Sequence, residues 1–126
     1  MSLETPLHKA QGLGSAHSGV GHFWKQRVTA VALIPLSLWF AISVLGLVGA
    51  PYAGVLNFLN NPVNAVLMAA FVLISLYHMT LGLQEVILDY VPHPGFKFVL
   101  TLVNYGFALT LAAATVISLL TIIPRS

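Results

Sequence analysis

Three long runs of apolar residues dominate the chain and are separated by short polar or helix-breaking segments. The runs span about Val28–Val48, Val63–Leu88 and Phe98–Ile123. Each is close to the roughly 20 residues that an α-helix needs to cross a bilayer. None alternates apolar and polar residues as barrel strands do, and lipid admits only helices or closed barrels. The pattern therefore predicts an all-α integral membrane protein with three transmembrane helices.

An N-terminal arm and two connections complete the predicted layout. Residues 1–24 form a polar arm without the apolar h-region of a signal peptide, and residues 25–126 form one membrane domain. The first connection, "GAPYAGVLNFLNNP", carries no charge, and the second is the short "DYVPHPGFK". Both contain residues that break helices or favour turns: Pro51, Asn60, Asn61, Pro62, Pro92, Pro94 and Gly95.

Composition supports the membrane assignment and removes other classes of protein. Of the 126 residues, 58% are hydrophobic and only 6% are charged, whereas ordinary soluble domains carry about 25% charged residues. The net charge of +2 comes from so few groups that no nucleic-acid interface is indicated. The absence of cysteine excludes disulfides, thiolate metal sites and covalent c-type haem attachment. In the arm, His8, His17 and His22 lack a fixed helical spacing, which favours a disordered or partner-bound surface over a metal site.

The basic residues predict the orientation of the helices in the membrane. Lys9, Lys25 and Arg27 precede the first run, and Lys97 lies in the second connection, which three helices would place on the same side. On the opposite side there is only Arg125. Because cytoplasmic loops carry the excess of Lys and Arg, we expect the N-terminus in the cytoplasm and the C-terminus in the periplasm.

The second apolar run carries a polar stripe along one side. At about 100° per residue, one face of this helix collects Ser75, His78, Gly82, Glu85 and Asp89, and the remaining positions are mostly apolar. Ionisable groups at bilayer depth are costly and normally face protein or a cavity. We therefore expect this face to lie against partners rather than against lipid.

His78 has two interpretations. It lies about 16 Å of helix rise from Asp89, so it is well inside the hydrocarbon. One interpretation is a hydrogen bond to a neighbouring helix, which stabilises membrane bundles. The other is an axial ligand of an embedded b-type haem, with Gly82 leaving room for a flat macrocycle. No other histidine lies within a span, so a second axial ligand would come from another subunit.

The interfacial residues also have two interpretations each. Tyr90 is typical of an aromatic anchor at headgroup level, and Asp89 of a charge at a helix end. Together they also suit a quinone site, in which a phenol donates to a quinone carbonyl beside a carboxylate that relays protons. Arg27 suits a belt of snorkelling cations or an anionic group such as a haem propionate. In the third run, the small and weakly polar residues follow helical spacing and indicate helix packing: Thr101, Asn104, Ala108, Thr115 and Ser118.

Two stretches carry a resemblance to a known family. In "HMTLGLQEVILDYV", a membrane-embedded histidine is followed by glycine four residues later and by Asp-Tyr-Val starting eleven residues later. The stretch "SGVGHFWKQRVTAVALIPL" precedes and begins the first span. With the three-helix layout, the chain resembles the hydrophobic membrane anchor subunits of succinate dehydrogenase, respiratory complex II, of the alphaproteobacterial type.

The resemblance implies roles for individual residues. His78 matches the axial ligand of haem b, whose other ligand comes from a companion cytochrome b subunit. Tyr90 matches the tyrosine that hydrogen-bonds ubiquinone, Asp89 the adjacent acid, and Arg27 the basic residue near the haem propionates and the quinone pocket. The role of His22 stays open. Glu85 departs from the neutral residue expected in the family, and its expected partner is a polar group of a neighbouring subunit.

The resemblance also implies a non-catalytic anchor within a respiratory complex of the bacterial inner membrane. A flavoprotein subunit oxidises succinate in the tricarboxylic acid cycle, an iron–sulfur subunit carries the electrons, and the anchor completes the ubiquinone-reduction site. The alternatives are a fumarate reductase anchor and a haem-free structural subunit of another membrane complex. A small transporter is disfavoured, because the sequence has neither symmetric repeats nor broken helices.

Overall fold

The structure is a row of three long helices. The computed structural model describes Pro6 and residues 16–123. The helices are α2 (Ala16–Leu47), α3 (Tyr52–Asn60), α4 (Pro62–Tyr90) and α5 (Pro94–Ile122), and the described residues contain no strand. Helices α2, α4 and α5 are each long and apolar enough to cross a membrane. The prediction of an all-α protein with three transmembrane helices is therefore confirmed.

Helix α2 extends beyond the predicted first span. It begins at Ala16, so residues 16–24, which the sequence analysis assigned to the polar arm, are helical. This segment contains no proline, so nothing in its backbone prevents the helix from starting before the apolar run. The predictions made for His8, Lys9 and Arg125 concern residues outside the described part of the chain, and the side chain of His17 is not described either.

Two prolines that the sequence analysis treated as breakers begin helices instead. Pro62 starts α4 and Pro94 starts α5, where a missing backbone N–H is harmless. The preceding residues cap both helices: Asn61 Oδ1 accepts from the Val63 N–H at 2.9 Å, and His93 Nδ1 accepts from the Phe96 N–H at 3.2 Å. The turn between α4 and α5 is therefore shorter than predicted.

The first connection forms a helix that the sequence analysis did not predict. Gly49, with a φ of 79°, follows the end of α2 in the left-handed conformation that glycine adopts without strain. Helix α3 follows, bounded by Pro51 and Asn61. The ring of Phe58 on α3 stacks on Trp39 of α2, with the ring centroids 6.0 Å apart, and α3 packs mainly against α4 and α5.

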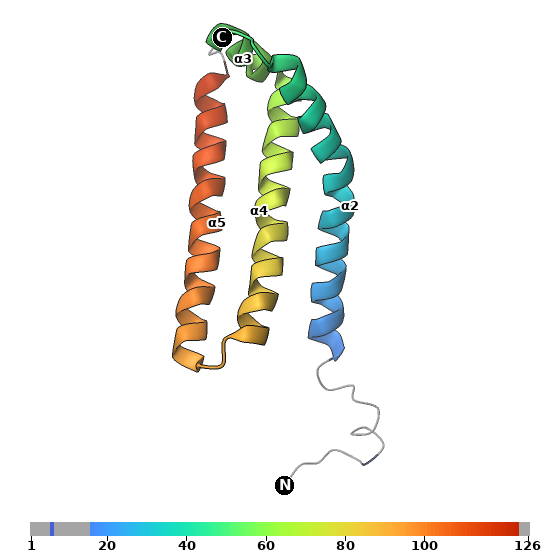
Figure 1. Cartoon of the computed structure of the whole chain (residues 1–126), viewed down its shortest axis with the longest axis vertical. Helices are drawn as coiled ribbons and strands as arrows, with labels where there is room; N and C mark the ends of the chain where they lie inside the picture. The colour runs from blue at the N-terminus through green and yellow to red at the C-terminus, as the bar shows by residue number, and fades with distance from the viewer. Residues whose placement is uncertain (1–5, 7–15, 124–126) are drawn as a thin grey trace.

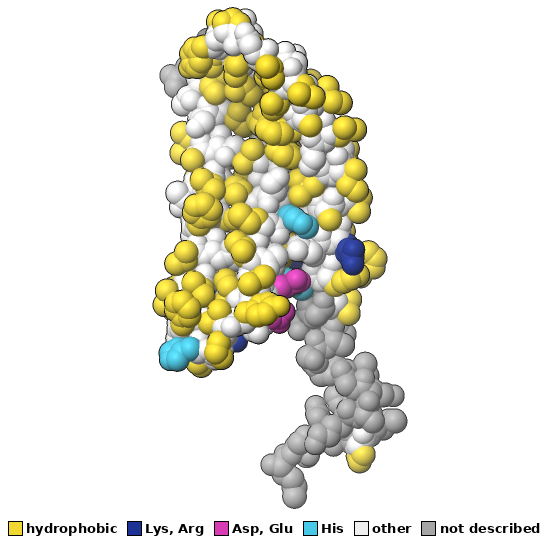
Figure 2. Space-filling model, viewed as in Figure 1, with side chains coloured by type: hydrophobic (Ala, Val, Ile, Leu, Met, Phe, Trp, Pro, Cys, Tyr) yellow, Lys and Arg dark blue, Asp and Glu magenta, His cyan; other side chains and the backbone are white. Residues whose placement is uncertain are grey.

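Helix α4 lies at the centre of the row. It packs against α2 on one side and α5 on the other, and α2 and α5 have no extensive contact with each other (Figure 1). Few side chains of the described residues are buried as a result; the apolar ones among them are Ala65, Leu81, Ile87, Ala108 and Leu119. Large apolar side chains are exposed along the helices, and apolar side chains cover much of the face in Figure 2. Such a surface suits lipid or partner subunits rather than water.

Candidate functional site

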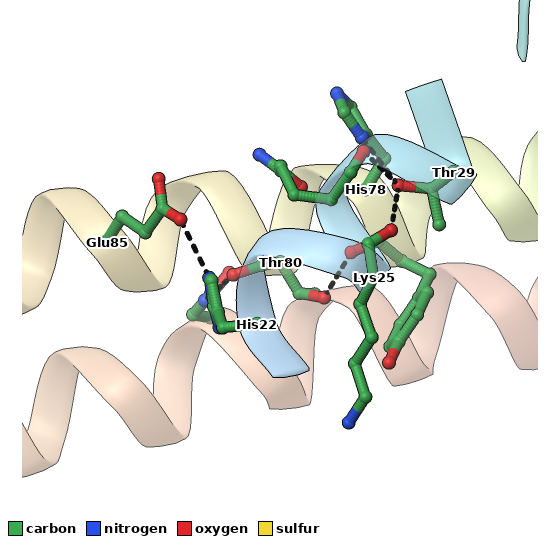
Figure 3. A network of polar contacts seen from close by, with 9 residues as sticks. His22, Lys25, Thr29, His78, Thr80 and Glu85 are labelled. Atoms are coloured by element: carbon green, nitrogen blue, oxygen red, sulfur yellow. Dashed lines mark hydrogen bonds and ion pairs between the residues drawn. The ribbon is translucent and has the colours of Figure 1, made fainter. Parts of the chain in front are cut away.

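A polar seam joins α2 and α4 (Figure 3) in the half of the row where α2 begins and the α4–α5 turn lies (Figure 1). We call it the α2–α4 seam, and it consists of three facing pairs: Thr29 with His78, Gln26 with Gly82, and His22 with Glu85. The helices run antiparallel, so about two turns along α2 face about two turns along α4. The stripe predicted on the second span therefore faces protein over this length.

The deepest pair of the α2–α4 seam joins a hydroxyl to an imidazole. Thr29 Oγ1 lies 2.8 Å from His78 Nδ1. The same oxygen lies 2.8 Å from the Lys25 carbonyl and 3.0 Å from the Gln26 carbonyl, both in the preceding turn of α2. Thr29 is only 8% exposed. The second ring nitrogen of His78 points away from Thr29 (Figure 3).

In the middle pair, the side-chain amide of Gln26 lies beside Gly82. A Cβ atom built on Gly82 would lie 3.4 Å from Gln26 Nε2. The Gln26 side chain therefore lies at contact distance from the position beside which room for a macrocycle is expected. Gln26 Oε1 is buried and has no hydrogen-bond partner among the described residues. Gly82 thus leaves room for the Gln26 amide between α2 and α4, and Gln26 brings a buried, unpaired acceptor to the site.

The third pair lies closest to the membrane interface. His22 Nε2 is 2.9 Å from Glu85 Oε1, with the side chains 29% and 50% exposed, and the two point toward one another (Figure 3). This distance is that of an ion pair, but His22 Nε2 has no hydrogen bond of good alignment. Glu85 therefore has a partner in its own chain, and the contact with a neighbouring subunit stays a prediction. The same contact brings His22, whose role the sequence left open, into the site.

A groove of about 750 Å³ runs along the α2–α4 seam. This volume falls in the range of cofactor and ligand sites. The residues that line it are His22, Phe23, Gln26, Arg27, Ala30, His78, Glu85 and Leu88. The Arg27 guanidinium lies over the Phe23 ring, 5.0 Å from its centroid, which holds the cation beside the groove. The groove combines apolar walls with one imidazole at depth and charged groups nearer its outer end.

The predicted site residues fall into two places. His78 and Arg27 line the same groove. Asp89 and Tyr90 lie at the end of α4, outside the residues that line it, and both are exposed, Tyr90 by 79%. Within this single chain, the proposed haem residues are therefore brought together and the proposed quinone residues are not joined to them.

Two contributors to the site, Thr29 and Gln26, were missed by sequence reasoning. A signal for them existed, because His22, Gln26 and Thr29 are spaced four and three residues apart and share one face of the first helix. These polar residues lie just before or within the first apolar run, and the polar stripe on α4 lies within the second run. Matching two polar stripes on consecutive antiparallel spans would have found both residues.

The packing interpretation of the third span is confirmed at its centre. Asn104 Nδ2 donates to the Thr80 carbonyl at 3.1 Å, and Gln84 Nε2 donates to Thr101 Oγ1 at 3.1 Å. Asn104 and Ala108 are buried on α5, which packs against α4. These contacts join α5 to α4 through neutral groups.

Comparison with known proteins gives one family. A model of the succinate dehydrogenase/fumarate reductase transmembrane subunit family matches residues 1–121. The chain is similar to the succinate dehydrogenase hydrophobic membrane anchor subunit of Paracoccus denitrificans, with 38% identity over 90 residues, 71% of this chain and 70% of the relative. The Rickettsia bellii subunit of the same name is 39% identical over 83 residues, 66% of each chain. The Rickettsia conorii subunit is 33% identical over 118 residues, 93% of this chain and 94% of the relative.

No solved structure matches the chain significantly. The family match over nearly the whole length agrees with the three apolar helices and with the resemblance of the stretches around His78 and Arg27. A subunit of this kind lies in the bilayer and assembles with other subunits of its complex. The chain belongs to the succinate dehydrogenase/fumarate reductase transmembrane subunit family, as a hydrophobic membrane anchor subunit of the succinate dehydrogenase type.

Proposed function

We propose that this anchor provides one axial ligand, His78, to a haem b and contributes Tyr90, Asp89 and Arg27 to a ubiquinone-reduction site. The observation that carries the proposal is the placement of His78. Its ring lies on a groove of about 750 Å³, one ring nitrogen is held by Thr29, and the other points away from that contact. An imidazole with one nitrogen held and the other free is the arrangement that metal-ligating histidines adopt.

The lining of the groove fits a haem. Phe23, Ala30 and Leu88 supply apolar surface for a macrocycle, and Arg27 supplies a cation for a propionate. The second axial ligand would come from a companion cytochrome b subunit, which would also cover the open side of the groove. When bound, haem b takes up and releases single electrons.

The quinone-site residues lie at the end of α4, where quinone headgroups meet the interface. Tyr90 would donate its phenol hydrogen to a ubiquinone carbonyl, and Asp89 would pass protons from water toward the same oxygen. Both side chains are exposed in the single chain, so a pocket around them requires neighbouring subunits. We assign these neighbours as the cytochrome b and iron–sulfur subunits, the latter receiving electrons from the flavoprotein that oxidises succinate in the tricarboxylic acid cycle.

The anchor on this proposal performs no bond chemistry alone, and it lies in the bacterial inner membrane. Lys25 and Arg27 near the start of α2 lie at the same end of the row as Lys97 near the start of α5 (Figure 1). An excess of basic residues is typical of the cytoplasmic side, and it supports the proposed orientation, with the N-terminus in the cytoplasm and the C-terminus in the periplasm.

Replacement of His78 tests the haem assignment. His78→Leu should abolish or alter the reduced-minus-oxidised b-type spectrum of the purified complex, because it removes the imidazole that is proposed as the axial ligand. Tyr77→Leu is the matched control, since Tyr77 is the neighbouring residue and lines a hollow on the α5 side instead. A spectrum that His78→Leu leaves unaltered would show that the anchor does not ligate haem and would favour a haem-free structural role.

Replacement of Tyr90 tests the quinone assignment separately. Tyr90→Phe should slow ubiquinone reduction by about tenfold, the effect of losing roughly 1.4 kcal/mol of binding in the transition state. Succinate oxidation by an artificial acceptor should stay near the wild-type rate, because that reaction bypasses the quinone. Equal loss in both assays would indicate defective assembly. The alternative, a fumarate reductase anchor, would be favoured if a low-potential quinol rather than ubiquinone is bound.

A further inference from the structure

Thr29 carries a hydroxyl in contact with three groups at once, two backbone carbonyls of α2 and the imidazole of His78 on α4. We infer that Thr29 is a positioning residue that holds His78 in the tautomer with hydrogen on Nδ1, so that Nε2 presents its electron pair away from Thr29. The inference rests on the proposed function, since it concerns how His78 is prepared as a ligand.

The assignment of the tautomer follows from counting protons. A threonine hydroxyl has one hydrogen to donate and lone pairs to accept with. The two carbonyl oxygens, at 2.8 and 3.0 Å, can only accept, so the hydroxyl hydrogen must point to them. The Thr29 oxygen is then left to accept at the 2.8 Å contact, and His78 Nδ1 must donate.

The reverse tautomer would leave unfavourable contacts. If Nδ1 were unprotonated, the hydroxyl would donate to the ring, and two carbonyl oxygens would lie within 3.0 Å of the Thr29 oxygen with no hydrogen between them. Thr29 is 8% exposed, so water has little access to relieve such a contact. In a site of low dielectric constant, an arrangement that satisfies all of these groups is strongly preferred over a mismatched one, so the tautomer with hydrogen on Nδ1 is favoured.

The contact has a chemical consequence for the ligand atom. When Nδ1–H donates to an oxygen, electron density at Nε2 increases and the ring orientation is fixed. A more basic ligand favours the oxidised over the reduced metal, so the contact lowers the reduction potential of an iron held at Nε2. The α2 backbone determines where the Thr29 oxygen lies. Helix α2 therefore affects the basicity of a ligand atom that α4 carries.

The test replaces the hydroxyl in the assembled complex and measures properties of the haem that do not depend on turnover. Thr29→Val keeps the shape of the side chain and removes the acceptor. We expect a positive shift of the haem midpoint potential and a loss of haem affinity of about 10- to 100-fold, the range known for outer-shell partners of metal ligands. Thr29→Ser keeps the hydroxyl and should retain the wild-type potential.

Thr110→Val provides a matched control. Thr110 Oγ1 makes the same type of bond to the carbonyl four residues earlier, at 2.8 Å, but is exposed on α5 away from the α2–α4 seam. It should leave the potential unchanged. If Thr29→Val does not assemble, Thr29→Ala removes the same hydroxyl without placing a methyl group against the ring.

The outcomes separate this inference from the proposed function. A midpoint potential that is the same in wild type, Thr29→Val and Thr110→Val would overturn the role of Thr29 while leaving ligation by His78 intact. Equal shifts in Thr29→Ser and Thr29→Val would also overturn it, since packing rather than the hydroxyl would then matter. A b-type spectrum that survives His78→Leu unaltered would overturn both.

Discussion

Helix α4 makes polar contacts on both of its packed sides, and the two sides differ in kind. Toward α5, the contacts join neutral amides, hydroxyls and carbonyls, as in the bond from Asn104 to the Thr80 carbonyl. Toward α2, the α2–α4 seam includes two histidines and a glutamate, His22, His78 and Glu85. Neutral hydrogen bonds between membrane helices serve mainly to hold them together, whereas ionisable groups at depth usually mark function.

The two sides also differ in the space that they leave. The groove on the α2–α4 seam has about 750 Å³ and is lined by charged and polar groups as well as apolar ones. The hollow between α4 and α5 has about 250 Å³, and its lining is mostly apolar and aromatic, including Tyr77 and Tyr105. Polarity in a membrane helix is therefore a weak indicator of a site by itself. It becomes a strong one when ionisable groups adjoin an open volume.

The largest effect is expected from filling the space at Gly82. Gly82→Leu must displace the Gln26 side chain, because a Cβ atom at Gly82 already reaches contact distance, 3.4 Å from Gln26 Nε2, and the rest of the leucine side chain needs further space. Overpacking of this kind destabilises by about 1–3 kcal/mol, and we expect lower haem content as well. Gly106→Leu on α5 is the control, since a Cβ atom on Gly106 meets nothing within 4 Å. Haem content in the purified complexes and thermal denaturation measure both effects, and equal results for the two variants would contradict the assigned role of Gly82.

An intermediate effect is expected from Asn104 on the α4–α5 side. Asn104→Leu removes the bond to the Thr80 carbonyl and should lower stability by about 0.6–1.7 kcal/mol, the range of interhelical hydrogen bonds in membranes. Thermal denaturation of the complex in detergent measures this loss. The haem spectrum should not change, because the bond lies on the other side of α4 from His78. A spectral shift as large as that caused by a substitution in the α2–α4 seam would contradict the view that only the α2 side of α4 affects the haem.

The smallest effect is expected from the His22–Glu85 pair. Its side chains are 29% and 50% exposed, and exposed ion pairs contribute about 0–1 kcal/mol. Glu85→Gln keeps the size of the side chain and should change the thermal midpoint little. A loss of stability comparable to that of Gly82→Leu would mean that the pair is buried by a partner subunit in the complex.

Much of the layout could be predicted from the sequence, because each span depends on a local apolar run and on helical spacing. The same reasoning placed His78 on a protein-facing stripe and identified Asn104 and Ala108 as packing residues. Helix α3 was not predicted, since the residues that bound it, Pro51 and Asn61, were read as breakers and not as helix boundaries.

The partners across the α2–α4 seam could not be predicted from one helix at a time. Which α2 residues meet His78 and Glu85 depends on how α2 and α4 are aligned along their axes. The short helix α3 connects them and affects that alignment. The roles of Tyr90 and Asp89 remain predictions for a physical reason. Their side chains face outward from this chain, so other subunits determine what surrounds them.

A row of three helices, unlike a closed bundle, has two broad faces and can cover neither by itself. His78 and the unpaired oxygen of Gln26 both adjoin a groove that this chain leaves open. Before assembly, lipid tails would meet the half-buried imidazole of His78, to which hydrocarbon offers no hydrogen bond, and the buried oxygen of Gln26 would stay unpaired. The consequence concerns biosynthesis: a newly inserted anchor gains much of its stability when a companion subunit arrives, so the lifetime of the unassembled chain should be short and its cellular amount should follow that of its partner.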